Sequence, residues 1–337
     1  MKLKKVQEGK IKLWIYPGRI YDVPVFYNPE MELSRDISVS CIQTFQKQSK
    51  LNLNICDALA GTGIRGLRYA KEISGIKKVV LNDKNPKAFN LIKKSIKLNK
   101  LSRKCIAKKG DANVLLHENV FNVIDIDPFG SPNIFLDSAA RSIWHKGFLC
   151  VTATDTAPLS GTYPQTCFKK YGIFSKKTEY YSELGMRILI SYIILTLAKR
   201  DRSFIPLLSH ATRHYFRVFG KIEHLGKLRN ILKQFKMFDG IGPIYLGKIK
   251  DNKFCKEVLK DLQKRDFKLG KQEERLLKLI ISEIDVPFYY DLHRMRKKQL
   301  PKIDEVIKKL KKKGFKASRT HFCLTGIKTN ANIKFFK

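Results

Sequence analysis

Residues 53–66 read LNICDALAGTGIRG, an apolar segment that ends at Asp57 and opens into Gly61, Gly63 and Gly66. Glycines let the backbone turn tightly and approach a ligand closely, and a helix is expected to begin at about residue 64. A strand, a glycine turn and a helix in this order predict a cofactor-binding parallel sheet. The turn alone does not distinguish NAD, a nucleotide and S-adenosylmethionine (SAM) as the ligand.

Three further strands are predicted after this turn, and an acid stands at the carboxyl end of each one. Asp83 lies about 20 residues beyond the glycines, where an acid binds ribose hydroxyls in such sheets. Asp111, followed by Ala112, ends the next strand, and Asp127 ends the last. Each acid alone is better explained as a helix N-cap. Together with Asp57, the set favours a doubly wound, Rossmann-like α/β sheet of the SAM-dependent methyltransferase type.

The last of these strands runs into Asp127, Pro128, Phe129 and Gly130. The aspartate offers a carboxylate, the proline has no N–H and leaves neighbouring carbonyls as acceptors, and the phenylalanine offers a flat apolar face. These groups suit a planar base whose exocyclic amine donates to the carboxylate and to a carbonyl while its ring stacks on the phenyl group. A strand followed by an ordinary Pro-Gly turn is the alternative, which the neighbouring cofactor-type turn disfavours.

The chain is strongly basic. Its 337 residues carry 67 Lys+Arg against 30 Asp+Glu, a formal net charge of +37. Nucleic acid is the favoured partner for such an excess, and a lysine-rich proteome is the alternative explanation. No signal peptide is evident, and the longest apolar stretch, ILISYIILTLA, is too short to cross a bilayer. We therefore expect a soluble, cytoplasmic protein that does not bind a membrane.

Before the glycine turn, the pattern predicts a helix with Ser34 as its N-cap. After the turn and the four strands named above, it predicts a fifth strand at 148–155 and two final strands within 206–222. Residues 155–175 have no period and are predicted to be an irregular active-site loop. A basic helix at 302–313, with aromatic and basic residues on both sides, is predicted to contact RNA; a solvated face is the alternative. The seven cysteines form no C-x-x-C pair, so no metal is expected.

Several long motifs make the chain resemble the tRNA (guanine-26-N2)-dimethyltransferase family nearly from end to end. These motifs are VFYNPEMELSRDISV (25–39), DALAGTGIRG (57–66), DIDPFGSPNIFLDSA (125–139), TATDTAPLSG (152–161), GPIYLG (242–247) and SRTHFCLTGIKTNA (318–331). The resemblance implies two domains. Residues 1–222 would form the SAM-binding catalytic domain, with an N-terminal extension to about residue 34. Residues 223–337 would form a smaller α+β domain that helps to hold tRNA.

The resemblance also implies the site residues. The expected SAM ligands are Arg35, Arg65, Asp83, Asp111 and Ala112, in addition to Asp57, Gly61 and Gly63 of the turn. The expected guanine pocket is Phe26, Asp127, Pro128 and Phe129. Members of the family often carry two C-x-x-C pairs before the GP-aromatic-LG motif. Here that stretch is KQFKMFDGIGPIYLG, so a zinc site is not expected.

In the expected reaction, Asp127 acts as base and amine acceptor, while Phe26 and Phe129 sandwich the guanine ring. Arg35 and Arg65 are expected to bind the methionine carboxylate of SAM; from spacing alone, a surface ion pair with Asp36 or a nearby acid explains Arg35 equally well. The alternatives are an amino methyltransferase acting on guanine-N2 of rRNA or on adenine-N6, and a non-catalytic RNA-binding protein. The oligomeric state is open, with a monomer favoured.

Overall fold

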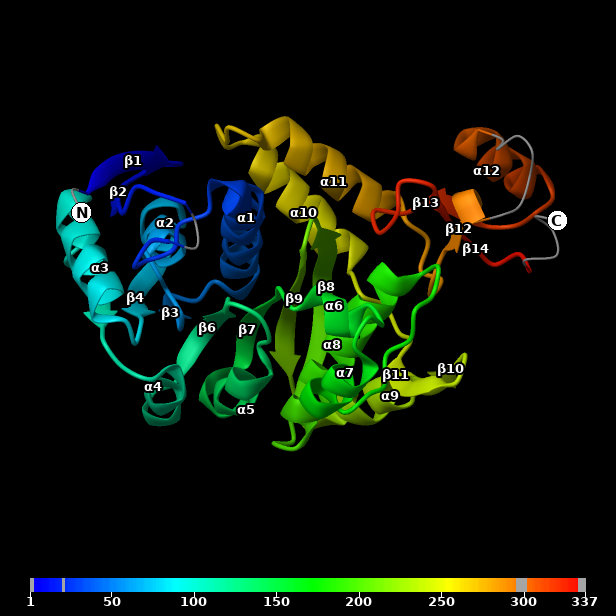
Figure 1. Cartoon of the computed structure of the whole chain (residues 1–337), viewed down its shortest axis with the longest axis horizontal. Coiled ribbons are helices and arrows are strands. Elements are labelled where there is room, and N and C mark those ends of the chain that lie inside the picture. Colours follow the sequence, from blue (N-terminus) through cyan, green and yellow to red (C-terminus); the bar gives the residue numbers. More distant parts are fainter. Residues whose placement is uncertain (1–2, 20–21, 295–301, 333–337) are drawn as a thin grey trace.

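The computed structural model describes residues 3–19, 22–294 and 302–332, and a seven-stranded sheet lies at its centre (Figure 1). In chain order its strands are β3 (Leu53–Asp57), β4 (Ile76–Asn82), β5 (Cys105–Lys108), β6 (Phe121–Ile126), β7 (Ile143–Ala153), β8 (Ser203–Thr212) and β9 (Tyr215–Glu223).

The strand order β5-β4-β3-β6-β7-β9-β8 confirms the doubly wound sheet. The first five strands are mutually parallel, and β9 runs antiparallel between β7 and β8. Because β3 pairs with both β4 and β6, the order reverses beside β3, and ligands bind at such a switch point in open α/β sheets. The glycine turn that follows β3 therefore opens at the switch point.

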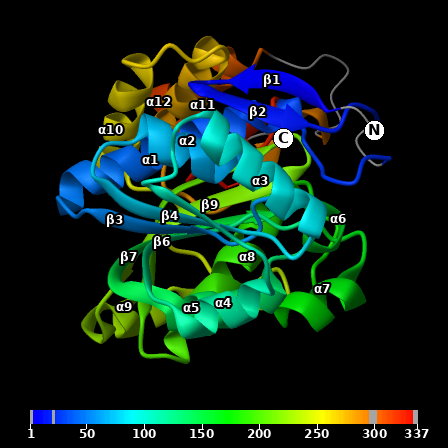
Figure 2. The ribbon, with the colours of Figure 1, turned by 90° about the vertical axis from the view of Figure 1, so that its left-hand side faces the viewer.

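Helices cover both faces of this sheet (Figure 2). One layer holds α1 (Glu32–Ser49), α2 (Ile64–Glu72), α3 (Pro86–Leu98), α10 (Asn252–Gln263) and α11 (Gly270–Ser282). The other holds α4 (Ala112–Glu118), α5 (Asn133–Ser142), α8 (Tyr181–Ala198) and α9 (Leu228–Leu232). Each layer encloses its own hydrophobic core against the sheet.

Two local predictions are wrong. Ser34 does not cap α1: the Asn28 side chain caps a 3-10 turn that begins with Pro29, and α1 continues from it, so Ser34 lies buried inside the helix. The segment 155–175 is not an irregular loop, because it contains α6 (Thr156–Leu159) and α7 (Pro164–Tyr171). These helices are short and begin at Thr or Pro, so their apolar positions show no clear period in the sequence.

The apolar stretch expected to be a core helix forms most of α8. By length and composition, α8 is the one helix among the described residues that could cross a membrane, and 72% of its 18-residue window is buried inside the protein.

The remaining elements lie at the two ends of the molecule. A hairpin of β1 (Lys4–Glu8) and β2 (Ile11–Ile15) packs beside α2 and α3. Residues after the sheet form the hairpin β10 (Phe235–Phe238) and β11 (Ile241–Tyr245), then a small sheet of β12 (Tyr290–Asp291), β14 (Gly326–Thr329) and β13 (Ala317–Arg319) with α12 (Ile303–Lys312).

The part after residue 222 packs in two different ways. Phe254, Val258 and Leu277 of α10 and α11 belong to the same core as α1, whereas Leu310 and Ile327 belong to a small separate core around α12. The division at 222/223 therefore remains a prediction.

Buried charges join the small C-terminal sheet to α8 of one helical layer and to the end of α11 of the other. The Lys328 ammonium of β14 lies 3.1 Å from a Glu183 oxygen on α8 and 3.5 Å from a Glu283 oxygen after α11. His321 also bonds Glu283. Burial raises the pKa of Glu283, but the charges and hydrogen bonds of His321 and Lys328 outweigh it and lower the pKa to about 2.

We expect Lys328→Met to destabilise the protein by about 3–5 kcal/mol, because it leaves two buried carboxylates short of a cation. The matched control is Lys248→Met, which removes an exposed ammonium 3.3 Å from Asp285 and is expected to cost under about 1 kcal/mol. Urea unfolding measures both free energies. Equal costs for the two variants would show that the buried pairs do not secure the C-terminal sheet.

Candidate active site

The glycine turn is held in place by Asp57. Its Oδ2 accepts a hydrogen bond from the Gly66 N–H at 2.8 Å. A Cβ at Gly66 would lie 2.9 Å from the Leu81 side chain, and Gly63 caps α2 with a φ of +82°, so neither position accommodates a larger residue without strain. Burial first and the charge of Asp125 second raise the pKa of Asp57 to about 8. Asp57 is buried and orders the turn through Gly66, and its contact with the cofactor remains a prediction.

Asp83 and Asp111 follow neighbouring strands next to this turn. The Asp83 carboxylate accepts from the Gly61 N–H and the Asn85 N–H, both at 2.8 Å, which ties the end of β4 to the turn. Asp111 caps α4 through Oδ1, so the N-cap interpretation holds for this acid. Ala112 is the buried first residue of that helix.

These residues fit a nucleoside cofactor. Each Asp83 oxygen has accepted one backbone hydrogen bond and can accept another from a ribose hydroxyl. The second Asp111 oxygen is not used by the cap and can accept from an amine. Gly61, with a φ of +54°, places the backbone of the turn next to Asp83 at the end of β4. The contacts of these residues with SAM remain predictions.

An ion pair with Arg65 orients the Asp127 side chain. Its Oδ2 lies 2.5 Å from Nη2 of Arg65, whose Nη1 donates to Ser38 Oγ at 3.0 Å. Burial raises the pKa of Asp127, but the charges of Arg65 and Arg217 outweigh burial and keep the pKa below its ordinary value. The Asp127 side chain remains 23% exposed. The site therefore presents an ionised carboxylate with a fixed orientation.

A second, deeper ion pair supports this one and was not predicted from the sequence. Arg217 of β9 binds both oxygens of Asp125, at 2.7 and 2.8 Å, and its Nη2 donates to Ser38. Tyr69 donates to the same carboxylate at 2.5 Å. Arg217 and Asp125 are fully buried. The available signals were an acid two residues before Asp127, on the same face of the strand, and an arginine inside an apolar strand.

The two aromatic residues of the predicted base pocket meet, but not as a sandwich. Phe26 and Phe129 contact edge to face, with centroids 4.7 Å apart and planes at 87°. Perpendicular rings in contact leave no parallel gap for a base in this arrangement, and the sandwich of a guanine between Phe26 and Phe129 remains a prediction. Phe129 is 77% exposed and offers an open face. Pro128 is buried, and the following Gly130 donates to Thr154 Oγ1 at 2.6 Å, which fixes the loop to the end of β7.

Arg35 forms an ion pair, which was one of the two roles predicted for it. The pair is buried and not at the surface, and the acidic partner is Glu8. The Nε and Nη2 of Arg35 bind the two Glu8 oxygens at 2.6 and 2.5 Å. Asp36 pairs instead with Arg68 at 2.5 Å. Arg35 and Arg65 thus both have acidic partners, and their role as ligands of the methionine carboxylate remains a prediction.

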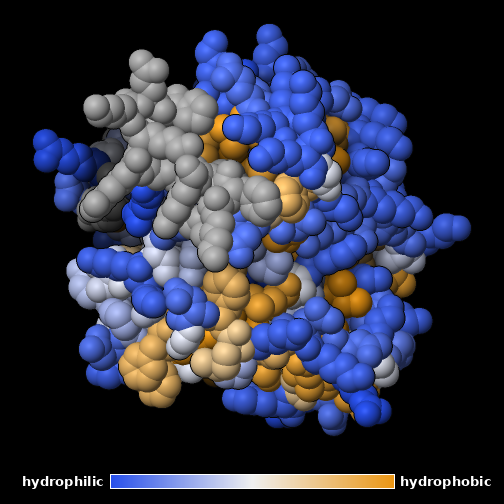
Figure 3. Space-filling view, turned by 90° about the vertical axis from the view of Figure 1, so that its right-hand side faces the viewer, coloured by the Kyte–Doolittle hydropathy of each residue, from blue (hydrophilic) through white to orange (hydrophobic). Residues whose placement is uncertain are grey.

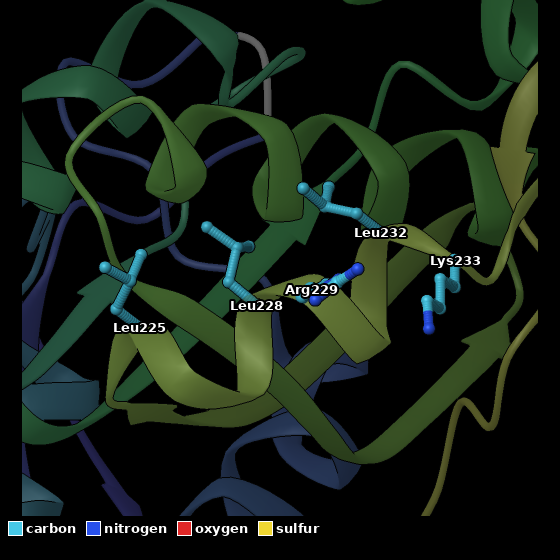
Figure 4. A pocket seen from close by; sticks show the side chains of 5 residues that line it. All are labelled: Leu225, Leu228, Arg229, Leu232 and Lys233. Atoms are coloured by element: carbon cyan, nitrogen blue, oxygen red, sulfur yellow. The ribbon is translucent and has the colours of Figure 1, made fainter.

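Other candidate sites are few. Among the residues that the structure describes, no group of three or more His, Cys, Asp or Glu side chains could hold a metal ion. A shallow hollow at α9 is lined by Leu225, Leu228, Arg229, Leu232 and Lys233 (Figure 4). The hollow adjoins His224, whose ring lies 5.9 Å from the ring of His145 near the start of β7. It therefore lies at the amino ends of the parallel strands, whereas Asp127 lies at their carboxyl ends.

Comparisons with known proteins agree with this geometry. The chain matches a family model described as N2,N2-dimethylguanosine tRNA methyltransferase over residues 5–238 and 226–337. The tRNA (guanine(26)-N(2))-dimethyltransferase of Methanosphaera stadtmanae is 38% identical over 98% of this chain and 95% of its own length. The Pyrococcus horikoshii enzyme of that name is 38% identical over 100% and 97%.

A solved structure is also similar over nearly the whole chain. The complex of Trm1 from Pyrococcus horikoshii with S-adenosyl-L-methionine gives a TM-score of 0.92 at 36% identity, covering 99% of this chain and 98% of that one.

We expect Asp83→Ala to weaken SAM binding by about 10- to 100-fold, because hydrogen bonds to a charged group each contribute about 1.5–3 kcal/mol. Titration calorimetry measures the affinity. The control is Asp137→Ala, an exposed acid on α5 that pairs with Arg200. If Asp83→Ala binds SAM as tightly as the Asp137→Ala control does, Asp83 is not a ligand of the cofactor.

Proposed function

Because this chain belongs to the N2,N2-dimethylguanosine tRNA methyltransferase family, we propose that it transfers methyl groups from SAM to the exocyclic N2 of guanine 26 in tRNA. The observation that carries this function is the ionised Asp127 beside the open ring of Phe129, at the switch point where the glycine turn begins. A base amine held there lies next to a cofactor held by the turn.

The guanine amine is a poor nucleophile, because its lone pair is delocalised into the ring. We propose that the Asp127 carboxylate and the Pro128 carbonyl accept its two hydrogens and so direct the lone pair toward the cofactor. SAM, when bound, would supply an electrophilic methyl group, and the electron pair of the broken S–C bond would stay on sulfur in the thioether that leaves. As the new N–C bond forms, the N2 proton passes to Asp127 and then to water. Alignment of the two reactants supplies most of the rate enhancement, and a base adds about 100- to 10,000-fold.

The low pKa of Asp127 suits this role. A carboxylate that stays ionised can always accept a hydrogen bond from the amine. It needs to take a proton only after methylation, when the positive charge on N2 has made the N–H strongly acidic. Arg65 and Arg217 supply the charge that keeps it ionised. Phe129 contributes about 1–3 kcal/mol by stacking on the guanine.

Arg35 and Arg65 are proposed to bind the methionine end of the cofactor. Each guanidinium has five N–H donors, and the bonds to Glu8, Asn28, Asp127 and Ser38 leave further donors on both. Asp83, Asp111 and Ala112 are proposed to bind the nucleoside end.

tRNA needs a wider surface than this site, and we propose that α12 provides part of it. Ile303, Val306, Ile307 and Leu310 turn toward the small core, so the opposite side of the helix carries exposed Lys308, Lys309 and Lys312. Arg319, also expected to contact RNA, is bound by both oxygens of Asp304. The face seen in Figure 3 is mostly hydrophilic. The aromatic and basic stretch predicted before this helix covers residues 287–298, and its residues 295–298 lie outside the described residues.

A tRNA substrate also favours a cytoplasmic location, and we propose that the protein acts there as a monomer.

We expect Asp127→Ala to lower kcat for methylation of a tRNA transcript by about 100- to 10,000-fold, with SAM affinity unchanged within about twofold. Asp127→Asn, which keeps one acceptor oxygen but loses the charge, is expected to fall between wild type and Asp127→Ala. Transfer of radiolabel from SAM measures the rate, and replacing guanine 26 in the transcript should abolish it. Near-wild-type turnover by Asp127→Ala would refute the catalytic role.

The pH dependence follows from the lowered pKa. Asp127 is charged above its ordinary pKa of about 4 and stays charged somewhat below it. We therefore expect no loss of kcat from protonation of Asp127 as the pH falls from about 8 to about 5. A kcat that falls with an apparent pKa near 6 in wild type, and not in Asp127→Asn, would contradict this expectation.

We expect the triple variant Lys308→Glu, Lys309→Glu and Lys312→Glu to raise the KM for tRNA at least about tenfold, since it removes phosphate contacts. The control reverses Lys94, Lys97 and Lys104, which are exposed at the opposite end of the molecule and give the same change of net charge (Figure 1). Initial rates at several salt concentrations measure both. An equal rise in KM would mean that net charge, and not α12, matters.

A further inference from the structure

The segment after β7 exposes a cluster of aromatic rings. Phe168 of α7 and Phe174 stack with centroids 4.2 Å apart and planes at 8°, yet they are 47% and 54% exposed. Tyr163 and Tyr181 are exposed on either side of them in the sequence. Large apolar rings gathered on a surface mark a binding site more often than chance exposure does.

Cations are interleaved with these rings. Lys170 and Lys176 are each paired with an aspartate, at 3.1 and 3.3 Å. Lys169 and Lys177 are exposed and form no ion pair with any residue that the structure describes. Exposed rings beside unpaired ammonium groups match bases beside phosphates, and not an apolar protein partner.

The cluster is fixed to the loop that carries Asp127 and Phe129. Ser131, at the end of this loop, donates to the Tyr171 hydroxyl of α7 at 2.7 Å, and that hydroxyl donates to Asp155 at 2.8 Å. Thr154 binds the same loop through Gly130. Hydrogen bonds from Ser131 to Tyr171 therefore connect α7, which carries Phe168, to the loop that carries Asp127.

From these contacts we propose that Phe168 and Phe174 form a stacking platform for the nucleotides that adjoin the target guanine of tRNA. The proposal rests on the proposed function. A guanine must leave its stack to reach Asp127, and its neighbours then each lose a stacking partner. The outer ring faces of the platform replace that partner, while Lys169 and Lys177 contact the flanking phosphates. The platform tolerates any base, because every base has a π-face.

The test compares two double variants. Phe168→Leu with Phe174→Leu keeps apolar bulk but removes the ring faces, and we expect it to raise the KM for tRNA about tenfold or more, with SAM affinity unchanged. Phe168→Tyr with Phe174→Tyr keeps the faces and should remain within about twofold of wild type. Trp144→Ala is the control, because it removes an exposed ring at the start of β7, at the opposite edge of the sheet.

A structural readout accompanies the kinetics. A tRNA transcript with 5-iodouridine at either side of position 26 should photocrosslink to the wild-type protein within residues 163–181, and the leucine variant should lose that crosslink. A second variant, Lys169→Glu with Lys177→Glu, changes only exposed side chains and should also raise KM for tRNA.

The outcomes separate the two proposals. If wild type does not methylate the transcript, the proposed function fails. If wild type methylates it but the leucine variant keeps its KM within twofold, or crosslinks form only outside 163–181, the platform is refuted. If the leucine variant loses SAM affinity or its melting temperature falls sharply, the rings are structural, which also refutes the platform.

Discussion

The buried pair of Arg217 and Asp125 is the contact on which the site depends. Two charges removed from water are stable only with close, complete pairing, and here both carboxylate oxygens, two guanidinium nitrogens, Tyr69 and Ser38 take part. The same Ser38 hydroxyl accepts from Arg65, which holds Asp127. The orientation of the reactive carboxylate is thus connected through hydrogen bonds to the centre of the sheet.

This arrangement explains why so many elements meet at one point. Asp125 and Asp127 come from β6, Arg65 from α2, Ser38 from α1 and Arg217 from β9. Arg217 of β9 lies opposite Thr152 of the intervening β7, donates to its hydroxyl, and reaches Asp125 of β6. The parallel strands provide the glycine turn and the acids. Arg65 of α2, together with Arg217 of the antiparallel strand, provides the charge that keeps Asp127 ionised.

A second buried network secures the outer layer. Asp36 of α1 faces Glu273 of α11, and burial first and the hydrogen bond with Asp36 second raise the pKa of Glu273 to about 10. Two carboxyl groups in such contact share a proton, so they hold α11 to α1 without a net repulsion. Arg68, beside Asp36, also pairs with Glu8 of the N-terminal hairpin. The elements before and after the sheet are thereby joined on one side of it.

The sequence by itself determined the strands, the glycine turn and the acids at the strand ends, because these follow from local periodicity and from residues with restricted backbone preferences. It also predicted Asp127 and Phe129 as a base-binding pair, since only Pro128 separates them in the chain. Local signals failed in two places. Asn28 with Pro29 overrode Ser34 as the helix start, and two short helices, of which only α7 begins at a proline, replaced the expected loop at 155–175.

Only the tertiary structure decided which charges pair. Arg35 finds Glu8 across 27 positions, Arg65 finds Asp127 across 62, and Arg217 finds Asp125 across 92. It likewise decided that Phe26 meets Phe129 edge to face and that Phe168 stacks on Phe174 at the surface. The physical reason is that a charge or a ring has no periodic signature. Its partner is whichever group the folded sheet brings within a few ångströms, and that depends on strand order and register together.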